Sequence, residues 1–170
     1  AEERAFIGTD IANRVAVLAF QQFVKREFVI ASNKKIQDNP PKNMNGDVEL
    51  LTVVVTGKNK KGYKVDIPRI GVEGFLPFDK MLSSRDRMHI GKRYSALIDV
   101  DSDEYGMGVP LTRQGKELVV AAFRQEVDDV NTGVVRVDEA AVVEGFGLLK
   151  IGVLVSSPAV SVDPVGACIG

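Results

Sequence analysis

The chain contains no tryptophan, one cysteine and one histidine among its 170 residues. A single thiol, Cys168, excludes an internal disulfide and a metal site made of cysteines alone, and it is compatible with a reducing cytosol. His89 lies in a polar turn context that is typical of a surface imidazole, and no serine or cysteine lies in a nucleophile motif such as G-x-S-x-G. The sequence therefore gives little support to an enzyme, and nothing in it predicts a cofactor.

Long apolar runs are also missing, since none approaches the ~20 residues that a membrane helix needs. The start of the chain has neither an initiator methionine nor the basic-then-apolar order of a signal peptide. We therefore expect no membrane association, and we expect the chain to be a piece of a longer protein.

Strong charge of one sign is absent, because the net charge is −1. The chain thus lacks the basic field that non-specific duplex binding usually requires. The charge is uneven along the sequence: residues 116–170 carry 4 basic and 8 acidic side chains, whereas residues 47–115 carry 11 and 10. With 45% hydrophobic and only 6% aromatic residues, the core must consist mainly of aliphatic side chains, a composition that favours sheets in one or two small domains.

The first third of the chain changes character near residue 30. Residues 9–30 have apolar side chains at helical spacing on more than one face, which predicts a helix packed on both the following domain and something that precedes it. Residues 31–47 combine Pro40 and Pro41 with asparagine and glycine and show no periodicity, so they predict a linker or long loop. The predicted division is a connecting helix over 1–30, followed by this linker.

The segment 48–113 consists of short β-type runs separated by turn residues. Five short strands over about 65 residues predict a small closed barrel, and the five-stranded OB-fold is the commonest RNA-compatible barrel of that size. The predicted strands are Val48–Thr56, Gly62–Ile67, Val72–Leu76, Arg93–Val100 and Gly108–Thr112.

Residues 114–170 follow an α/β pattern. An apolar stripe predicts a helix near Lys116–Val127, and two strands follow at Val134–Val143 and Leu148–Val155, with a turn at residues 144–147. Asp163 can cap a final helix that begins at Pro164. The predicted fold class is mainly β with α/β: a long helix, an OB-type barrel and an incomplete α-β-β-α module.

Basic residues alternate with aromatic ones in two places within the predicted barrel. A groove for single-stranded nucleic acid uses cations for phosphates and aromatic rings for base stacking. The alternative for such lysines is a solvated edge turn that blunts an exposed strand. The candidate RNA-binding residues from this pattern are Lys58, Lys60, Lys61 and Tyr63, together with Lys92 and Arg93.

Two further motifs leave alternatives open. Gly71 and Gly74 allow a strongly bent barrel strand, in which Phe75 points either into the core or onto the binding face. Asp99, Asp101 and Asp103 imitate the opening of a calcium loop, but Glu104 stands where that loop needs glycine, so we expect an acidic hairpin turn instead.

Several of these motifs resemble NusA-type bacterial transcription factors. The runs at 71–77, 90–93 and 109–113 are similar to the S-one-type RNA-binding OB domain of that family, and residues 118–127 are similar to the first helix of its first KH domain. The run from Asp163 to Gly170 resembles the segment that leads into the GxxG loop, which clamps RNA backbone in KH domains.

This resemblance implies a domain division and a function. Residues 1–30 would be the connecting helix of a polymerase-binding N-terminal domain, 48–113 the barrel, and 114–170 an incomplete first KH domain. Gly166 and Gly170 would belong to its RNA-binding segment, with Gly170 as the first glycine of the loop. The implied partners are nascent single-stranded RNA, RNA polymerase and other transcription factors in the bacterial cytoplasm, without enzymatic activity.

Two other functions remain open at this point. S-one-type barrels and KH domains also occur as accessory RNA-binding modules of ribonucleases or translation-related proteins, although the order of barrel then KH domain favours the transcription factor. A structural module whose barrel contacts only protein is the third hypothesis, because the basic balance of the chain is weak.

Overall fold

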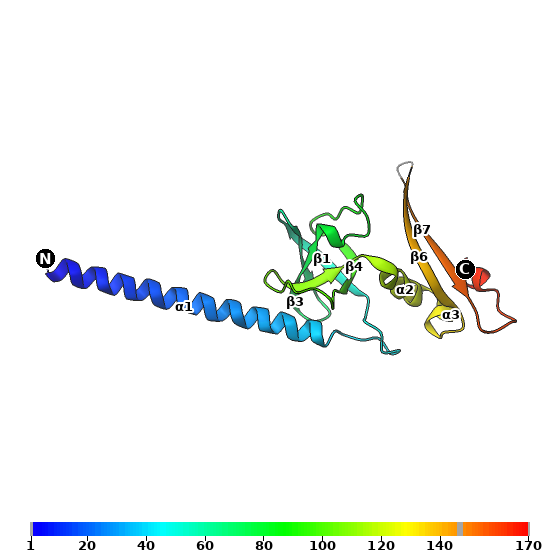
Figure 1. The fold of residues 1–170 in the computed structure, drawn as a ribbon, viewed down its shortest axis with the longest axis horizontal. Coiled ribbons are helices and arrows are strands. Elements are labelled where there is room, and N and C mark those ends of the chain that lie inside the picture. Colours follow the sequence, from blue (N-terminus) through cyan, green and yellow to red (C-terminus); the bar gives the residue numbers. More distant parts are fainter. Residues whose placement is uncertain (1, 146–147, 170) are drawn as a thin grey trace.

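The structure is a computed structural model that describes residues 2–145 and 148–169. A long helix, a small barrel and a helix-and-hairpin region follow one another along an elongated molecule (Figure 1). The elements are α1 (Glu2–Asp38), β1 (Leu51–Lys58), β2 (Gly62–Ile67), β3 (Val72–Pro77), the 3-10 helix η1 (Phe78–Lys80), β4 (Arg93–Ile98), β5 (Val109–Thr112), α2 (Gly115–Glu126), α3 (Asp128–Asn131), β6 (Arg136–Gly145), β7 (Leu148–Ser156) and α4 (Pro164–Ile169).

The barrel confirms the predicted five-stranded closed architecture. Its strands pair in the order β1-β2-β3-β5-β4, and β1 closes the barrel by pairing with β4, with Leu51 opposite Ala96. All neighbours are antiparallel except β3 and β5, which run parallel. Alternate residues of the strands point inward and form an aliphatic core, in which Val53, Ile67 and Leu76 are fully buried.

Helix α1 extends beyond its predicted end, so the prediction of a linker over 31–47 is wrong for its first eight residues. The physical reason is a pair of polar side chains one helical turn apart. The Asn33 amide donates to the Tyr105 carbonyl at 2.8 Å, and the Gln37 amide donates to the Asp99 carbonyl at 2.7 Å. These bonds hold the last turns of α1 against the barrel, and the helix ends just before the proline pair.

The remainder of α1 projects away from the barrel (Figure 1). Between residues 10 and 29 its large apolar side chains are exposed; Phe20 and Phe28, for example, are 67% and 73% exposed. The apolar residues lie on several faces of the helix, as the sequence predicted, and do not form a single stripe. No helix of the described residues is both long enough and apolar enough to cross a membrane.

The region after the barrel forms a second, smaller core. Helices α2 and α3 pack beside the β6–β7 hairpin. The buried centre of this second core consists of Val130, Val135 and Val137. Helix α4 begins at Pro164, as predicted, and the Asp163 carboxylate accepts a hydrogen bond from the Val165 amide at 3.2 Å. The predicted turn at 144–147 lies partly outside the described residues.

Two side-chain contacts connect the 42–48 loop to this second region. The Arg124 guanidinium of α2 forms an ion pair with Asp47. The Asn45 amide donates to the Asn131 carbonyl at the end of α3, at 2.9 Å. The loop therefore joins the barrel to the following helices through polar contacts, in addition to the chain connection at residues 113–114.

Candidate nucleic-acid interface

The turn between β1 and β2 is held by side-chain hydrogen bonds and presents three lysines to solvent. The Asn59 side-chain oxygen accepts hydrogen bonds from the amides of Lys61 and Gly62, at 2.8 and 3.0 Å. Gly62 packs tightly against β3, since a Cβ at this position would overlap the Leu76 carbonyl oxygen and lie 2.8 Å from the Pro77 Cα. The structure thus brings together the exposed predicted residues Lys58, Lys60 and Lys61.

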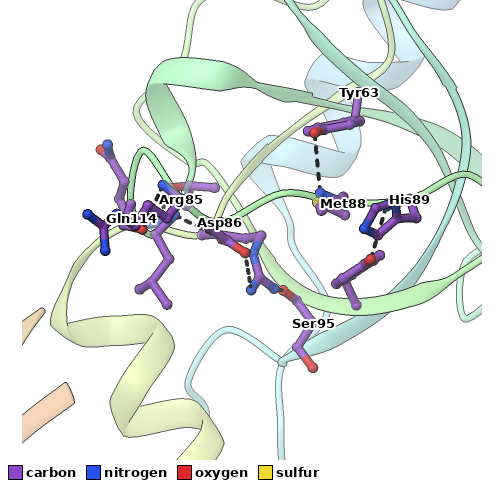
Figure 2. Close-up of polar contacts among 12 residues, drawn as sticks. Tyr63, Arg85, Asp86, Met88, His89, Ser95 and Gln114 are labelled. Carbon is purple, nitrogen blue, oxygen red and sulfur yellow. Dashed lines mark hydrogen bonds and ion pairs between the residues drawn. The ribbon is translucent and has the colours of Figure 1, made fainter. Parts of the chain in front are cut away.

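Tyr63 follows this turn, but its ring is only 5% exposed and belongs to the barrel core. Alternation along β2 explains the burial, because Tyr63 shares the inward face with Val65 and Ile67. Its hydroxyl accepts a hydrogen bond from the Met88 amide at 3.2 Å, as Figure 2 shows. The predicted role of Tyr63 as a base-stacking platform is therefore corrected: this ring supports the surface and offers no open face.

Phe75 is 4% exposed, so its ring also offers no open face to a base. It alternates with Gly74 and Leu76, whose positions face the barrel core, and thus lies on the outer side of β3. On that outer side it lines a hollow with Lys60 and Lys61. The structure thus matches neither alternative in full: Phe75 is buried, but it lies outside the barrel core on the outer side of β3.

The exposed aromatic ring at this surface belongs to Phe78, which the sequence pattern did not identify as a binding residue. Phe78 is 38% exposed in η1, and its ring contacts Tyr63 edge to face, with centroids 5.2 Å apart. The Lys58 ammonium lies 5.3 Å from the Phe78 centroid and 5.6 Å from the Tyr63 centroid. An ammonium at this distance is attracted by the ring quadrupole. Lys58, Tyr63 and Phe78 are thus one assembled cluster.

Two hollows flank Phe78. The first, which we call the Arg87 hollow, has a volume of about 410 Å³ and is lined by Lys58, Tyr63, Phe78, Asp86 and Arg87 among others. The second, which we call the acidic hollow, has a volume of about 520 Å³. Its charged lining residues are Lys60, Lys61, Asp79, Lys80, Asp101, Asp103 and Glu104.

The loop over residues 81–92, which forms one wall of the Arg87 hollow, is held by polar contacts (Figure 2). Asp86 forms an ion pair with Arg113 at 2.8 Å, and both side chains are largely buried. The same carboxylate accepts a hydrogen bond from the Leu82 amide at 3.2 Å, and the His89 amide donates to the Tyr94 hydroxyl at 2.9 Å. The loop is therefore fixed at both ends.

Lys92 and Arg93 lie elsewhere on the barrel. Lys92 is exposed in the turn before β4, where its amide donates to the His89 carbonyl at 3.1 Å. Arg93 pairs with Val54 across β1 and lines a different hollow, together with Glu49 and Arg69. The structure does not bring these two residues into the cluster around Phe78.

The predicted KH residues lie at the end of the chain. Gly166 is exposed in α4, where a Cβ would approach the Asp163 carboxylate to 2.7 Å. Gly170 lies outside the described residues. The proposed role of these glycines therefore remains a prediction from the resemblance.

Asp99 is buried just after the end of β4, where its carboxylate contacts Lys80 and the backbone of the following turn. Its Oδ2 lies 3.0 Å from the Lys80 ammonium, and its Oδ1 accepts a hydrogen bond from the Asp101 amide at 3.2 Å. The hydrogen bond with Asp99, together with the charge of that carboxylate, raises the pKa of Lys80 above its ordinary value of 10.5. Among residues 2–145 and 148–169, no group of three histidine, cysteine, aspartate or glutamate side chains could hold a metal ion.

Comparisons with known proteins agree with the resemblance in the sequence. No protein-family model matches the chain. The chain is homologous over 96% of its length to the transcription termination/antitermination protein NusA of Thermus thermophilus, with 27% identity over 165 residues. A protein of the same name from Halalkalibacterium halodurans is 26% identical over 122 residues, or 72% of this chain. The chain spans 41% and 31% of the lengths of these two relatives.

Proposed function

We propose that this chain is part of a NusA-type transcription factor that associates with RNA polymerase and nascent RNA and modulates pausing, termination and antitermination. The observation that carries the proposal is the extent of the homology, which includes α1, the barrel and the following region in one alignment with the Thermus thermophilus protein. We infer that the chain acts by binding and not by catalysis. Its contribution would be to place RNA relative to the transcription machinery.

The barrel would contact single-stranded RNA at the cluster of Lys58, Tyr63 and Phe78. An exposed aromatic ring and a cation are the two groups that single-stranded RNA sites combine, for base stacking and for phosphate attraction. Phe78 takes the stacking role first assigned to Tyr63. The Phe78 ring is exposed, and the buried Tyr63 ring packs against it edge to face. Lys60 and Lys61 of the same turn remain candidates for phosphate contact.

The region from α2 to α4 would be an incomplete KH domain, in keeping with the resemblance of its final residues. Its elements follow the order helix, strand, strand, helix, with the short α3 inserted after α2. In a KH domain the GxxG loop clamps the RNA backbone. This part would therefore continue the RNA path beyond the barrel.

Transcription by reconstituted bacterial elongation complexes tests the proposal. A protein that contains this chain should change the duration of pauses, and photo-crosslinking should join its barrel to the nascent transcript. The Thermus thermophilus relative serves as the positive control, and the same protein with Phe78→Leu as the matched variant. Unchanged pausing together with no crosslink to RNA or polymerase would overturn the proposed function.

A further inference from the structure

We infer that a backbone phosphate of single-stranded RNA binds in the Arg87 hollow, between Lys58 and Arg87, and that the acidic hollow on the other side of Phe78 repels the RNA backbone. This inference rests on the proposed RNA contact of the barrel and names the side of Phe78 on which the backbone passes. It moves the phosphate site from the lysine pair at 60–61 to a residue that the sequence pattern did not mark.

The charges of the acidic hollow disfavour an anion. Lys60 and Lys61 line it, but four carboxylates line it too, namely Asp79, Asp101, Asp103 and Glu104. The third lysine, Lys80, already forms an ion pair with buried Asp99 at 3.0 Å. Phosphate entering this hollow would therefore meet more carboxylate than ammonium groups, and like charges at close range disfavour binding.

The Arg87 hollow has the opposite balance. Asp86 is the one carboxylate among its described lining residues, and its ion pair with Arg113, at 2.8 Å, neutralises it. Lys58 and Arg87 then remain as two cations without a carboxylate partner in the same hollow. A phosphate could be contacted there by a guanidinium fork and an ammonium group, the two donors that proteins use for phosphate.

The position of Arg87 is prepared before any ligand arrives. Arg87 directly follows Asp86, whose carboxylate is bound to Arg113 and to the Leu82 amide, and it precedes Met88, whose amide is bound to the Tyr63 hydroxyl. The residues before and after Arg87 are thus anchored to the barrel, and Figure 2 shows the contacts of Asp86 and Met88. Pre-organisation of this kind lowers the entropic cost of binding.

Arg85 offers a matched control within the same loop. It is an exposed arginine two residues from Arg87, and it lies on the other side of Asp86 in the sequence. It does not line the Arg87 hollow. General attraction between RNA and the positive charge of the loop would involve Arg85 and Arg87 equally, whereas a phosphate site in the hollow involves Arg87 alone.

The experiment is a titration of the 170-residue chain with labelled oligouridylate over a series of KCl concentrations. Each phosphate contact to a single strand contributes about 0.7 to the slope of log affinity against log salt. We expect Arg87→Gln and Lys58→Gln each to lower the slope by about 0.7 and the affinity at about 0.1 M salt about fivefold. Arg85→Gln should bind as the wild type does. Because all three side chains are exposed, thermal melting should show that the variants fold normally.

The outcomes separate this inference from the proposed function. If wild type binds and Arg87→Gln keeps the full slope, or if the double variant Lys60→Gln and Lys61→Gln loses slope instead, the phosphate site is wrong while RNA binding stands. If wild type binds no oligouridylate at all, both the site and the proposed RNA contact of the barrel fail. Oligodeoxythymidylate distinguishes the source of the phosphate: tighter binding of DNA than RNA would overturn RNA as the occupant.

Discussion

Replacing Gln37 with alanine should release the end of α1 from the barrel. The Gln37 side chain is 3% exposed, and its amide donates hydrogen bonds to the carbonyls of Asp99 and Ser102, at 2.7 and 2.5 Å. Among the residues of α1 whose side chains are described, 10–38, the last turns are held in this way, whereas residues 10–29 are exposed. Local detachment is therefore the expected effect, with the barrel itself still folded.

The magnitude follows from the two hydrogen bonds. A neutral hydrogen bond contributes about 0.5–1.5 kcal/mol net, so Gln37→Ala should cost the docked state about 1–3 kcal/mol. Alanine has the highest helix propensity, which means that the loss cannot come from weaker helix formation. Asn33→Ala removes one hydrogen bond and should cost about half as much. The two effects should not add fully, because both residues anchor the same turns.

Hydrogen exchange measured by mass spectrometry tests this directly. Protection in the peptides that cover residues 31–38 and 99–105 should fall about 5- to 150-fold in Gln37→Ala, the range that 1–3 kcal/mol gives. The barrel strands should exchange as in the wild type. Lys35→Ala, on an exposed position of the same turn, is the control. If Gln37→Ala exchanges like Lys35→Ala, the hydrogen bonds do not hold α1 and the packing of Ile36 must do so.

Three further predictions concern the barrel and the hairpin. Gly62→Ala should lower the free energy of unfolding, measured in urea, by about 1–3 kcal/mol, because the new Cβ would overlap a backbone oxygen. Gly57→Ala is the control and should change this free energy much less, since its Cβ would meet nothing closer than 3.9 Å. Because the folded-state pKa of Lys80 is raised, its contribution to stability is complete below pH 10.5 and is lost as the pH rises further; Lys80→Arg should remove that part of the alkaline decline measured by denaturation. Amides of β6 and β7 should exchange faster than those of β1 and β2, since Val143 and Leu154 are 57% and 60% exposed; equal protection in the two sheets would contradict this.

The barrel was predictable in part because β1 and β2 alternate between buried and more exposed positions. In β2, for example, Tyr63, Val65 and Ile67 point inward while Lys64 and Asp66 point outward, a period-2 pattern that is visible in the sequence. The end of α1 was not predictable in this way. Residues 31–38 are mostly polar, a composition that is typical of a loop. They are helical because Asn33 and Gln37 bind carbonyls more than 60 positions away in the chain.

The binding surface was predicted only in part, for a related reason. Lys58, Lys60 and Lys61 were identified because a cluster of basic residues is visible in the sequence itself, and all three are exposed in the structure. The same local reasoning assigned Tyr63 to the surface, although the alternation of β2 already placed it inside. Phe78 follows Pro77 at the end of β3, and it shares the Arg87 hollow with residues of the 81–92 loop. The local sequence around Phe78 does not indicate that neighbourhood.

The pair Asp86–Arg113 connects this surface to the region after the barrel. Arg113 lies between the end of β5 and the start of α2, and its amide donates to the Lys80 carbonyl at 2.8 Å. Asp86 immediately precedes Arg87 in the loop that lines the Arg87 hollow. A rotation of α2 that displaces Arg113 must therefore either break a largely buried ion pair or move the loop that carries Arg87. The proposed phosphate site and the orientation of the C-terminal region are therefore coupled through this ion pair, in addition to the contacts that Asp47 and Asn45 make with α2 and α3. An RNA strand bound to both parts would favour a single arrangement of them.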